Sequence, residues 1–389
     1  MSDETVSAEQ VTIALDAMSG DLGAGTAVAA AVAAVRSHAD IKMILVGDES
    51  VLAPMVKPVL KKSSAADGSS IADRLEVHHA SEVVTMEESA AQAIRMKKDS
   101  SMRVAVNLVH NGTADACVSC GNTGALMGTA KFVLKTLPGI DRPAIVTTMP
   151  NVRVGKVQML DLGANVDCTA EQLYQFAIMG SALAKVVGSV SVPRVGLLNI
   201  GSEEIKGNEL VKEADKLLQQ ADINYIGFVE GDQVYLGDVD VVVTDGFVGN
   251  VALKSTEGVA KLITGFLKQE FARTPLTKLM ALCARPVLKR LRDRIDPRRY
   301  NGASLLGLKG LVIKSHGSAD VVGIENAIGV ARLEARKDLV SLIEATTKKS
   351  LQSHSDNFND EGKDKGNGNA SDGGNTSGIS TEKTTSRVD

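Results

Sequence analysis

The chain has 389 residues, of which 44% are hydrophobic and 23% charged, and its formal net charge is −4. This length suits two domains or one large α/β unit, and with 3% aromatic residues and no tryptophan the core must be aliphatic. The acidic balance, without zinc-finger spacing or an RNA-binding aromatic signature, argues against nucleic-acid binding. A polar N-terminus, no membrane-length apolar run and four cysteines without a disulfide framework lead us to expect a cytoplasmic protein.

Short apolar runs alternate with helical patterns along the whole chain. In the first half, strands are predicted over 11–17, 41–46, 75–78, 116–118, 144–149 and 157–162, and helices over 26–38, 48–62, 87–98, 102–110, 123–135 and 170–187. In the second half, strands are predicted over 194–200, 224–229, 239–244 and within 305–314, and helices over 208–220, 248–271 and 319–351. This alternation predicts an α/β fold with a mostly parallel sheet covered by helices on both faces.

Two segments depart from this alternation. Residues 351–389 are rich in Ser, Asn, Gly and Asp and are expected to be a disordered polar tail, as residues 1–10 are expected to be a flexible N-terminus. Between them, 11–350 is predicted to be one α/β domain. Within it, residues 268–299 hold ten Lys and Arg against three Asp and Glu, threaded with leucines. We expect a protruding basic helical hairpin over about 266–299, divided into short pieces by Pro275 and Pro286.

A glycine-rich turn joins the predicted strand at 116–118 to the helix after it. A strand that leads through such a turn into a helix N-terminus presents unpaired N–H groups beside the positive end of the helix dipole, which suits phosphate. A plain N-cap at Asn122 or Thr123 explains the same residues equally well. The candidate phosphate ligands of this turn are Ser119, Gly121, Asn122 and Thr123.

Four further polar turns follow apolar strands. Asp16 and Asp21 follow the first strand, where two carboxylates could orient a nucleophile, cap a helix or hold magnesium. For Asp21 a structural role, as a helix cap or in an ion pair, is favoured. The other turns contain Asn165, Asn208 with Lys206, and Asp245 with Asn250. We expect these turns to meet at one rim of the sheet. Phosphate also needs a cation, and the candidates are Lys206, Arg142 and Lys254.

Several other functions lack their sequence signatures. The glycines at 20, 23 and 25 do not match the dinucleotide-binding fingerprint, and neither a nucleophile elbow nor a Walker lysine motif occurs. Cys117 and Cys120 form a lone CxxC without a second pair, so Cys117 is predicted to be a core residue. His78 and His79 have no partners at metal-ligand spacing. No metal site is predicted.

Eight motifs occur in an order that resembles one known family. They are LDAMSGD, MKKDSS, SCGNTGALMGTAK, GIDRPAI, LDLGANVD, NIGSEEIKGNEL, VTDGFVGNVALK and IKSHGSAD, spread over roughly residues 12–342. In these motifs the chain resembles the phosphate acyltransferase family of bacterial phospholipid synthesis, although the family usually has glycine at position 19 and a small residue at position 120. The resemblance implies a fold similar to phosphate acetyltransferases and isocitrate dehydrogenases.

The resemblance also implies an activity. The enzyme would transfer a long fatty acyl group from acyl carrier protein to inorganic phosphate, without a cofactor, and its acyl-phosphate product would feed a membrane glycerol-3-phosphate acyltransferase. It would be a homodimer attached peripherally to the inner face of the cell membrane. Two alternatives remain: a short-chain phosphate acetyltransferase that uses coenzyme A, and a non-catalytic membrane-associated scaffold.

Roles for the candidate residues follow from this chemistry. Attack of phosphate on a thioester needs a positioned oxyanion and donors for the tetrahedral intermediate, but no covalent enzyme intermediate. Lys206 is expected to supply charge, and Asn165, Asn208 or Asn250 to polarise the carbonyl. Asp16 or Asp245 would orient a phosphate proton or a lysine, and His316 is a weaker acid–base candidate.

The basic segment has three interpretations: a solvated hairpin or dimer arm, a docking face for the acidic acyl carrier protein, and a membrane-surface element. The resemblance favours the third, and the second can coexist with it. The expected membrane-contacting residues are Leu276, Leu279, Met280, Leu282, Arg285, Lys289 and Arg290.

Overall fold

The structure is a computed structural model that describes residues 10–63, 71–153, 155–188 and 190–350. Its first part contains strands β1 (Val11–Asp16), β2 (Ile41–Gly47), β3 (Leu75–His79) and β4 (Ala116–Ser119) and helices α1 (Gly23–Ser37), α2 (Glu49–Ser63), α3 (Ala90–Met96), α4 (Ser101–His110) and α5 (Thr123–Leu134). Every strand predicted here is confirmed, with ends that differ by one residue. The segments predicted for the tail and for the first nine residues lie outside the described residues.

The second part contains strands β5 (Ala144–Pro150), β6 (Lys156–Leu160), β7 (Val195–Leu198), β8 (Tyr225–Val229), β9 (Val241–Val243), β10 (Ala303–Leu306) and β11 (Leu311–Lys314). Its helices are α6 (Ala170–Val187), α7 (Glu209–Gln219), α8 (Gly246–Ala272), α9 (Pro275–Ile295) and α10 (Val321–Arg336). The predicted closing helix over 319–351 is interrupted at residues 337–338, where Asp338 has a φ of 46°, and helix resumes over 339–350.

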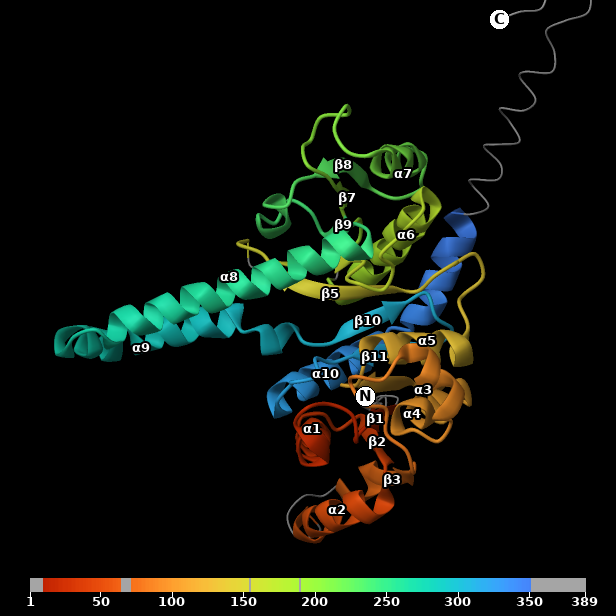
Figure 1. The fold of residues 1–389 in the computed structure, drawn as a ribbon, viewed down its shortest axis with the longest axis vertical. Helices are drawn as coiled ribbons and strands as arrows, with labels where there is room; N and C mark the ends of the chain where they lie inside the picture. The colour runs from red at the N-terminus through yellow and green to blue at the C-terminus, as the bar shows by residue number, and fades with distance from the viewer. Residues whose placement is uncertain (1–9, 64–70, 154, 189, 351–389) are drawn as a thin grey trace, which may run out of the picture.

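All eleven strands belong to one sheet in the order β3-β2-β1-β4-β11-β10-β5-β6-β9-β7-β8. The pairings are parallel except β11–β10, β10–β5 and β5–β6, so the predicted mostly parallel sheet is confirmed. Because three pairings reverse the chain direction, β6, β9, β7 and β8 run opposite to β1 to β4 and β11. In Figure 1 the β1–β4 half lies below and the β7–β9 half above.

The two faces of the sheet bury two separate aliphatic cores. In β1, Ile13 and Leu15 join the core that includes α1, α6 and α10, whereas Ala14 joins the core that includes α4 and α5. Alternate side chains of a strand point to opposite faces, so a sheet with helices on both sides needs apolar residues at consecutive positions. This is why the strands were recognisable as continuous apolar runs.

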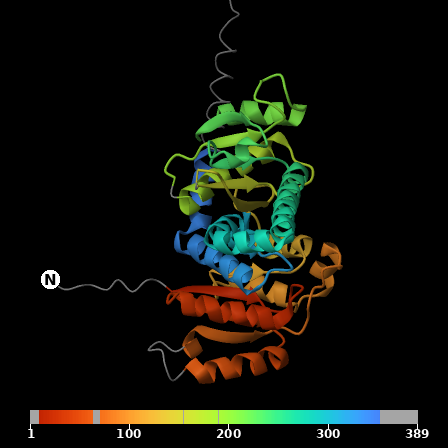
Figure 2. The ribbon, with the colours of Figure 1, turned by 90° about the vertical axis from the view of Figure 1, so that its left-hand side faces the viewer.

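Helices α8 and α9, which we call the arm, project from the body as a hairpin (Figure 1). Figure 2, where the arm points toward the viewer, shows it leaving between the two halves of the sheet. The hairpin expected over about 266–299 is therefore longer, because α8 already begins at Gly246. The predicted division is confirmed at Pro275, which takes the first position of α9 beside the Thr274 cap, where proline fits. It is wrong at Pro286, because α9 continues through that residue.

Candidate functional site

Asp16, Ser119 and Lys314 lie side by side at the carboxyl ends of three adjacent strands. The register pairs Asp16 of β1 with Ser119 of β4, and Ser119 with Lys314 of β11. Residues paired across parallel strands point to the same face of the sheet, about 4.8 Å apart from strand to strand. These three residues and the loops that follow them, at 17–21, 120–122 and 315–318, are called the strand-end cluster below.

Asp16 is the centre of the hydrogen bonds in this cluster. It is fully buried, and its two carboxylate oxygens accept from the hydroxyls of Ser101 (2.6 Å) and Ser119 (2.7 Å) and from the backbone N–H of Ser19 (3.3 Å). The Ser119 hydroxyl in turn accepts from the N–H of Gly121 (3.1 Å). Asp16 therefore fixes the positions of the Ser119 turn and of its own loop.

Asn122 is the N-cap of α5, as its structural interpretation predicted. Its Oδ1 accepts from the N–H of Ala125, and its Nδ2 donates to the carbonyls of Met86 (2.7 Å) and Glu88 (3.2 Å). The side chain is thus fully used to hold the turn. The N–H groups of Thr123 and Gly124, in the first turn of the helix, have no intrahelical acceptor and remain available to an anion.

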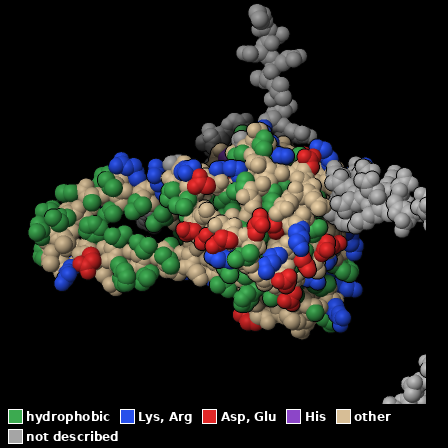
Figure 3. Space-filling model, turned by 90° about the horizontal axis from the view of Figure 1, so that it is seen from above, with side chains coloured by type: hydrophobic (Ala, Val, Ile, Leu, Met, Phe, Trp, Pro, Cys, Tyr) green, Lys and Arg blue, Asp and Glu red, His purple; other side chains and the backbone are tan. Residues whose placement is uncertain are grey.

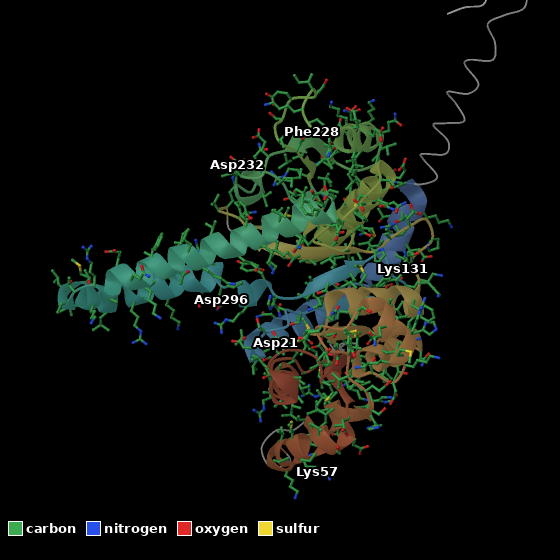
Figure 4. The ribbon with its side chains drawn as sticks, in the orientation of Figure 1. Asp21, Lys57, Lys131, Phe228, Asp232 and Asp296 are labelled. Atoms are coloured by element: carbon green, nitrogen blue, oxygen red, sulfur yellow. The ribbon has the colours of Figure 1, made fainter. Side chains whose placement is uncertain are left out.

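The loops of the cluster are packed so closely that glycine is required. A Cβ added to Gly20, where φ is 104°, would lie 2.8 Å from the Cβ of Cys120 and 3.2 Å from the Gly317 carbonyl oxygen. The N–H of Asp21 donates to that same carbonyl (2.8 Å). The Asp21 side chain does not cap α1, which begins one residue later with Leu22 as an N-cap without a side-chain bond, so the helix-cap interpretation is wrong. Figure 4 labels Asp21 in the lower half, on the side where the arm projects.

Lys314 and His316 follow each other at the end of β11. Lys314 is buried, and its pKa is lowered by burial and by the nearby charge of Lys254, whereas Cys120, Asp16 and Asp21 act in the opposite direction. The sequence analysis named His316 but missed Lys314. The apolar run of β11 was the available signal, since Lys314 ends a strand whose three other residues are all apolar.

His316 is placed as a hydrogen-bond donor at neutral pH. Its Nδ1 accepts from the N–H of Ser318 (3.2 Å), which leaves Nε2 with the proton. Partial burial and Lys254 lower the pKa of His316, so the ring is neutral. Lys254 itself lies on α8 and pairs with Glu257 (3.0 Å). Its influence on both His316 and Lys314 shows that the first turns of the arm pass over the strand-end cluster.

A second group of polar residues surrounds the beginning of α8. The buried Asp161 carboxylate accepts from the N–H groups of Ile145 (2.9 Å), Ala164 (3.2 Å) and Asn165 (2.6 Å) and from the Asn165 Nδ2 (3.0 Å). Burial raises the pKa of Asp161, and these donors oppose that shift. Asp161 thus organises the loop after β6 as Asp16 organises the loop after β1.

The glycines of the DGFVGN motif allow α8 to lie on this loop. A Cβ at Gly249 would meet the Asp161 carbonyl oxygen at 1.9 Å, and the N–H of Gly246 donates to the Asn165 carbonyl (2.8 Å). Asp245 caps α8 by accepting from the N–H of Val248 (2.9 Å). Asn250 is exposed beside Gly163, and no hydrogen bond of its amide is recorded among the described residues. The Asn250 amide is thus open to a ligand.

Lys206 and Asn208 lie on the loop between β7 and α7. Lys206 is 43% exposed and pairs with Glu203 (2.8 Å), which raises the pKa of the lysine. Asn208 caps α7 by accepting from the N–H of Val211 (2.9 Å). Six strand spacings, roughly 29 Å, separate β4 from β7 in the sheet. Within the described ranges, no recorded contact joins Lys206 to the Ser119 turn.

The expected single rim is replaced by two opposed strand ends. Because β6, β9 and β7 run opposite to β4 and β11, their carboxyl ends belong to the other edge of the sheet. Each strand step also twists the sheet by about 20–25°, and over six steps this rotation turns much of the second edge back toward the first. The charge of Lys254 acts on both Lys314 and His316, which places the beginning of α8 near the end of β11.

The two groups together offer complementary chemistry. The strand-end cluster holds one buried cation, Lys314, and several hydroxyls, and the free N–H groups of α5 begin beside it, which together suit an oxyanion. The α8 group presents an exposed amide, Asn250, suited to a carbonyl oxygen. Arg142 is exposed near Asp161, close enough to Cys168 to influence its thiol. Among the described residues no set of three His, Cys, Asp or Glu side chains is arranged to hold a metal ion.

Comparison with known proteins identifies the family. A family model described as "Fatty acid synthesis protein" matches residues 11–342. The phosphate acyltransferase of Methylococcus capsulatus is 58% identical over 326 residues, which cover 84% of this chain and 94% of that protein. The phosphate acyltransferase of Nitrosococcus oceani is 56% identical over 335 residues, covering 86% and 96%.

Solved structures share the fold at low sequence identity. A phosphotransacetylase from Streptococcus pyogenes superposes with a TM-score of 0.54 at 18% identity, covering 84% of this chain and 94% of its own. The EutD phosphotransacetylase from Staphylococcus aureus gives 0.53 at 18% identity, covering 85% and 96%. The predicted likeness to phosphate acetyltransferases is thus confirmed at the level of fold. Since the family model spans nearly all of the described chain and relatives exceed half identity, this protein belongs to the fatty acid synthesis protein family.

Proposed function

We propose that this protein transfers a long-chain fatty acyl group from acyl carrier protein to inorganic phosphate, giving acyl-phosphate for phospholipid synthesis. The observation that carries the proposal is the 58% identity to a phosphate acyltransferase over 84% of the chain. The strand-end cluster supports it, since it combines donors for an oxyanion with a neutral histidine. No cofactor enters the proposal.

The reaction needs few steps. An oxygen of hydrogen phosphate attacks the thioester carbonyl carbon, and a tetrahedral oxyanion forms. The carbon–sulfur bond then breaks, its electron pair goes to the thiol sulfur of the carrier, and the phosphate proton passes to the departing thiolate or to water. Because a thiolate is a good leaving group, positioning and stabilisation of the oxyanion supply most of the rate enhancement.

The proposed residues divide into two groups. On the phosphate side are Ser119, Gly121, Asn122, Thr123, Lys254 and His316, with Asp16 holding the turn in place. On the thioester side are Arg142, Asn165, Lys206, Asn208, Asp245 and Asn250. In this second group the Asn250 amide faces the carbonyl oxygen, Asp245 and Asn165 position α8, and Lys206 brings positive charge from the β7–α7 loop.

The role of Lys206 is tested by Lys206→Ala. Its side chain is exposed and bonded only within its loop, so the variant should fold normally while acyl transfer to phosphate falls by about 100-fold, as for a lost charged contact. Lys212→Ala is a matched control, because Lys212 also forms an exposed i,i+3 pair with a glutamate. Near-normal turnover of Lys206→Ala would remove this lysine from the mechanism.

The acyl donor is tested by comparing two substrates. With labelled phosphate, palmitoyl-acyl carrier protein should give acyl-phosphate, whereas acetyl-coenzyme A should give little product. The fold shared with phosphotransacetylases is the observation that favours the alternative donor. Preference for acetyl-coenzyme A would replace the proposed function by a short-chain phosphate acetyltransferase, and no turnover of either donor would leave the scaffold interpretation.

We also propose that the arm mediates attachment to an anionic membrane surface. In the part of the chain that the structure describes, no helix has the length and apolar character needed to cross a bilayer. Instead, Leu276, Leu279, Met280 and Leu282 of α9 are 55–63% exposed. Arg285, Lys289 and Arg290 follow on the same helix, and each contributes ~1 kcal/mol near anionic lipid. The protein would thereby act at the inner face of the cell membrane, where a glycerol-3-phosphate acyltransferase uses its product.

The remaining apolar surface of the arm supports a homodimer. Val259, Leu262, Ile263 and Phe266 of α8 are each more than half exposed, and Figure 3 shows hydrophobic side chains along both helices of the arm. Such a continuous apolar surface on a projecting hairpin is typical of a protein or membrane contact. We assign the α8 part to a second copy of the chain and the α9 part near the turn to the membrane, with acyl carrier protein attracted to the basic residues of α9.

A further inference from the structure

Lys314 is a buried lysine without an anionic partner. The residue is only 9% exposed. Among the described residues no carboxylate lies within 4 Å of the Lys314 Nζ, which donates instead to the backbone carbonyl of Ser315. The buried carboxylate of the strand-end cluster, Asp16, already accepts from the hydroxyls of Ser101 and Ser119. An ammonium group removed from water without a counter-ion is costly, so this position is an unusual place for lysine in a purely structural role.

A second polar side chain of the same cluster also lacks a partner. Ser19 is 6% exposed, and its buried hydroxyl has no hydrogen bond among the described residues. It faces Gly121, since a Cβ added to that glycine would lie 3.0 Å from the Ser19 Oγ. Glycine at 121 thus keeps the space between the Ser19 hydroxyl and the beginning of α5 free of a side chain.

Helix geometry supplies the third set of donors at this point. Asn122 caps the N–H of Ala125, which leaves the N–H groups of Thr123 and Gly124 without an acceptor. The register of β4 and β11 places Lys314 directly beside Ser119, the residue that begins this turn. An ammonium, a hydroxyl and two helix N–H groups therefore surround the Ser119 turn, and among the described residues no anionic acceptor is recorded for any of them.

We propose that Lys314 and Ser19, together with the first N–H groups of α5, bind the phosphate substrate, with Lys314 as its buried counter-ion. This inference rests on the proposed function and deepens it, because it identifies the phosphate-binding cation. Lys206, by contrast, is exposed and pairs with Glu203. Lys254, on the arm above, adds a second positive charge when the arm lies over the cluster.

Asp21 gives this site a means of selecting phosphate. The Asp21 carboxylate lies beside Gly317: a Cβ added to Gly317 would be 3.3 Å from the Asp21 Oδ2. The negative charge of Asp21 also acts on Lys314. Hydrogen phosphate can donate its P–OH proton to a carboxylate, whereas sulfate has no proton to donate at neutral pH and would meet only repulsion. The site should therefore prefer phosphate to sulfate, and Asp21→Asn should reduce that preference.

The test compares Lys314→Met with the wild type and with Lys309→Met, an exposed lysine in the preceding loop. Methionine fills a similar volume without charge, so Lys314→Met should raise the KM for phosphate by about 100-fold and leave the KM for the acyl donor unchanged. Its melting temperature without phosphate should equal or exceed that of the wild type, because an unpaired buried charge has been removed. Ser19→Ala should raise the phosphate KM in the same direction, and Lys309→Met should have no effect.

A readout without the acyl donor separates this inference from the proposed function. Millimolar phosphate should raise the melting temperature of the wild type and of Lys309→Met but not that of Lys314→Met, and sulfate should raise it less. If phosphate stabilises the wild type through Lys314 but no acyl group is transferred, only the proposed function fails. If acyl transfer occurs and Lys314→Met keeps the wild-type phosphate KM, or if it melts below the wild type, the assignment of Lys314 is overturned.

Discussion

Glu334 is a buried carboxyl group whose protonation couples to stability. It is 1% exposed, one oxygen accepts from the Ser304 hydroxyl (2.5 Å), and the other has no partner among the described residues. It lines a cavity of about 210 Å³ between α6 and α10. Burial raises its pKa from 4.5 to about 7. The folded state therefore keeps a proton that the unfolded chain loses between these two pH values.

The expected consequence is a loss of stability as the pH rises. Below the unfolded-state pKa, Glu334 is protonated in both states and its titration does not change the free energy of unfolding. Above the folded-state pKa, the titration lowers the free energy of unfolding by about 3 kcal/mol. Glu334→Gln keeps the Ser304 bond without the titration, so its free energy of unfolding relative to wild type should rise by about 2–3 kcal/mol between roughly pH 5 and pH 8. Urea unfolding at both pH values measures this, with exposed Glu213→Gln as control. A difference independent of pH would contradict the assignment.

Individual residues also mark where prediction from sequence ends. Cys117 was predicted to be in the core, and Asn122 could be placed at a helix N-cap, because strand patterning and capping are local properties. Lys314 was overlooked because its importance depends on its burial and on its neighbours at the ends of β1 and β4, which are distant in the chain. The helix-cap interpretation of Asp21 failed by one residue, because α1 begins at Gly23.

At the scale of elements, the contact between α8 and the loop after β6 depends on Gly249. Gly249→Ala places a Cβ at 1.9 Å from the Asp161 carbonyl oxygen, so α8 must shift and the variant should be destabilised by more than about 2 kcal/mol, with activity lost. The matched control lies in the same helix: Gly258→Ala meets nothing within 4 Å and should stabilise the protein by about 0.5–1 kcal/mol. Thermal unfolding measures both effects, and Gly249→Ala should melt at a lower temperature than Gly258→Ala. Equal melting temperatures would contradict the close packing of α8 on the loop after β6.

The arm is the element through which membrane attachment is tested. Replacing Leu279, Met280 and Leu282 together with Glu removes apolar contacts and adds charges that anionic lipid repels, so sedimentation with anionic liposomes should be abolished. A control with the same charge change off the arm replaces three exposed apolar residues, Met96, Val152 and Val192. If the arm variant still sediments with the liposomes, α9 is not the membrane-binding element.

The arm also shows how an element can be predicted with wrong limits. Its basic, leucine-rich composition indicated a hairpin, but Pro286 was given too much weight and most of α8 was assigned to the body. Pro286 is tolerated because the helix is exposed on most sides, where a carbonyl that loses its partner can bond to water. Local composition predicts that a helix exists more reliably than it predicts where the helix leaves the body.

At the scale of the whole molecule, sheet topology determines how the loops meet. The sequence predicted the strands and the parallel character of the sheet, because buried strands leave continuous apolar runs. It could not predict the antiparallel pairing of β10 with β5, which joins segments that are distant in the chain. The expectation of one rim was therefore too simple, and the twist of the sheet together with α8 brings the two strand ends toward a common region.

The central claim is that phosphate, and not water, receives the acyl group. The most direct measurement is the stoichiometry of the reaction with palmitoyl-acyl carrier protein and labelled phosphate, in which free carrier thiol and acyl-phosphate are counted together. The account predicts one acyl-phosphate for each thiol released, and no thiol release when phosphate is omitted. Thiol release without acyl-phosphate, or at the same rate in the absence of phosphate, would contradict it.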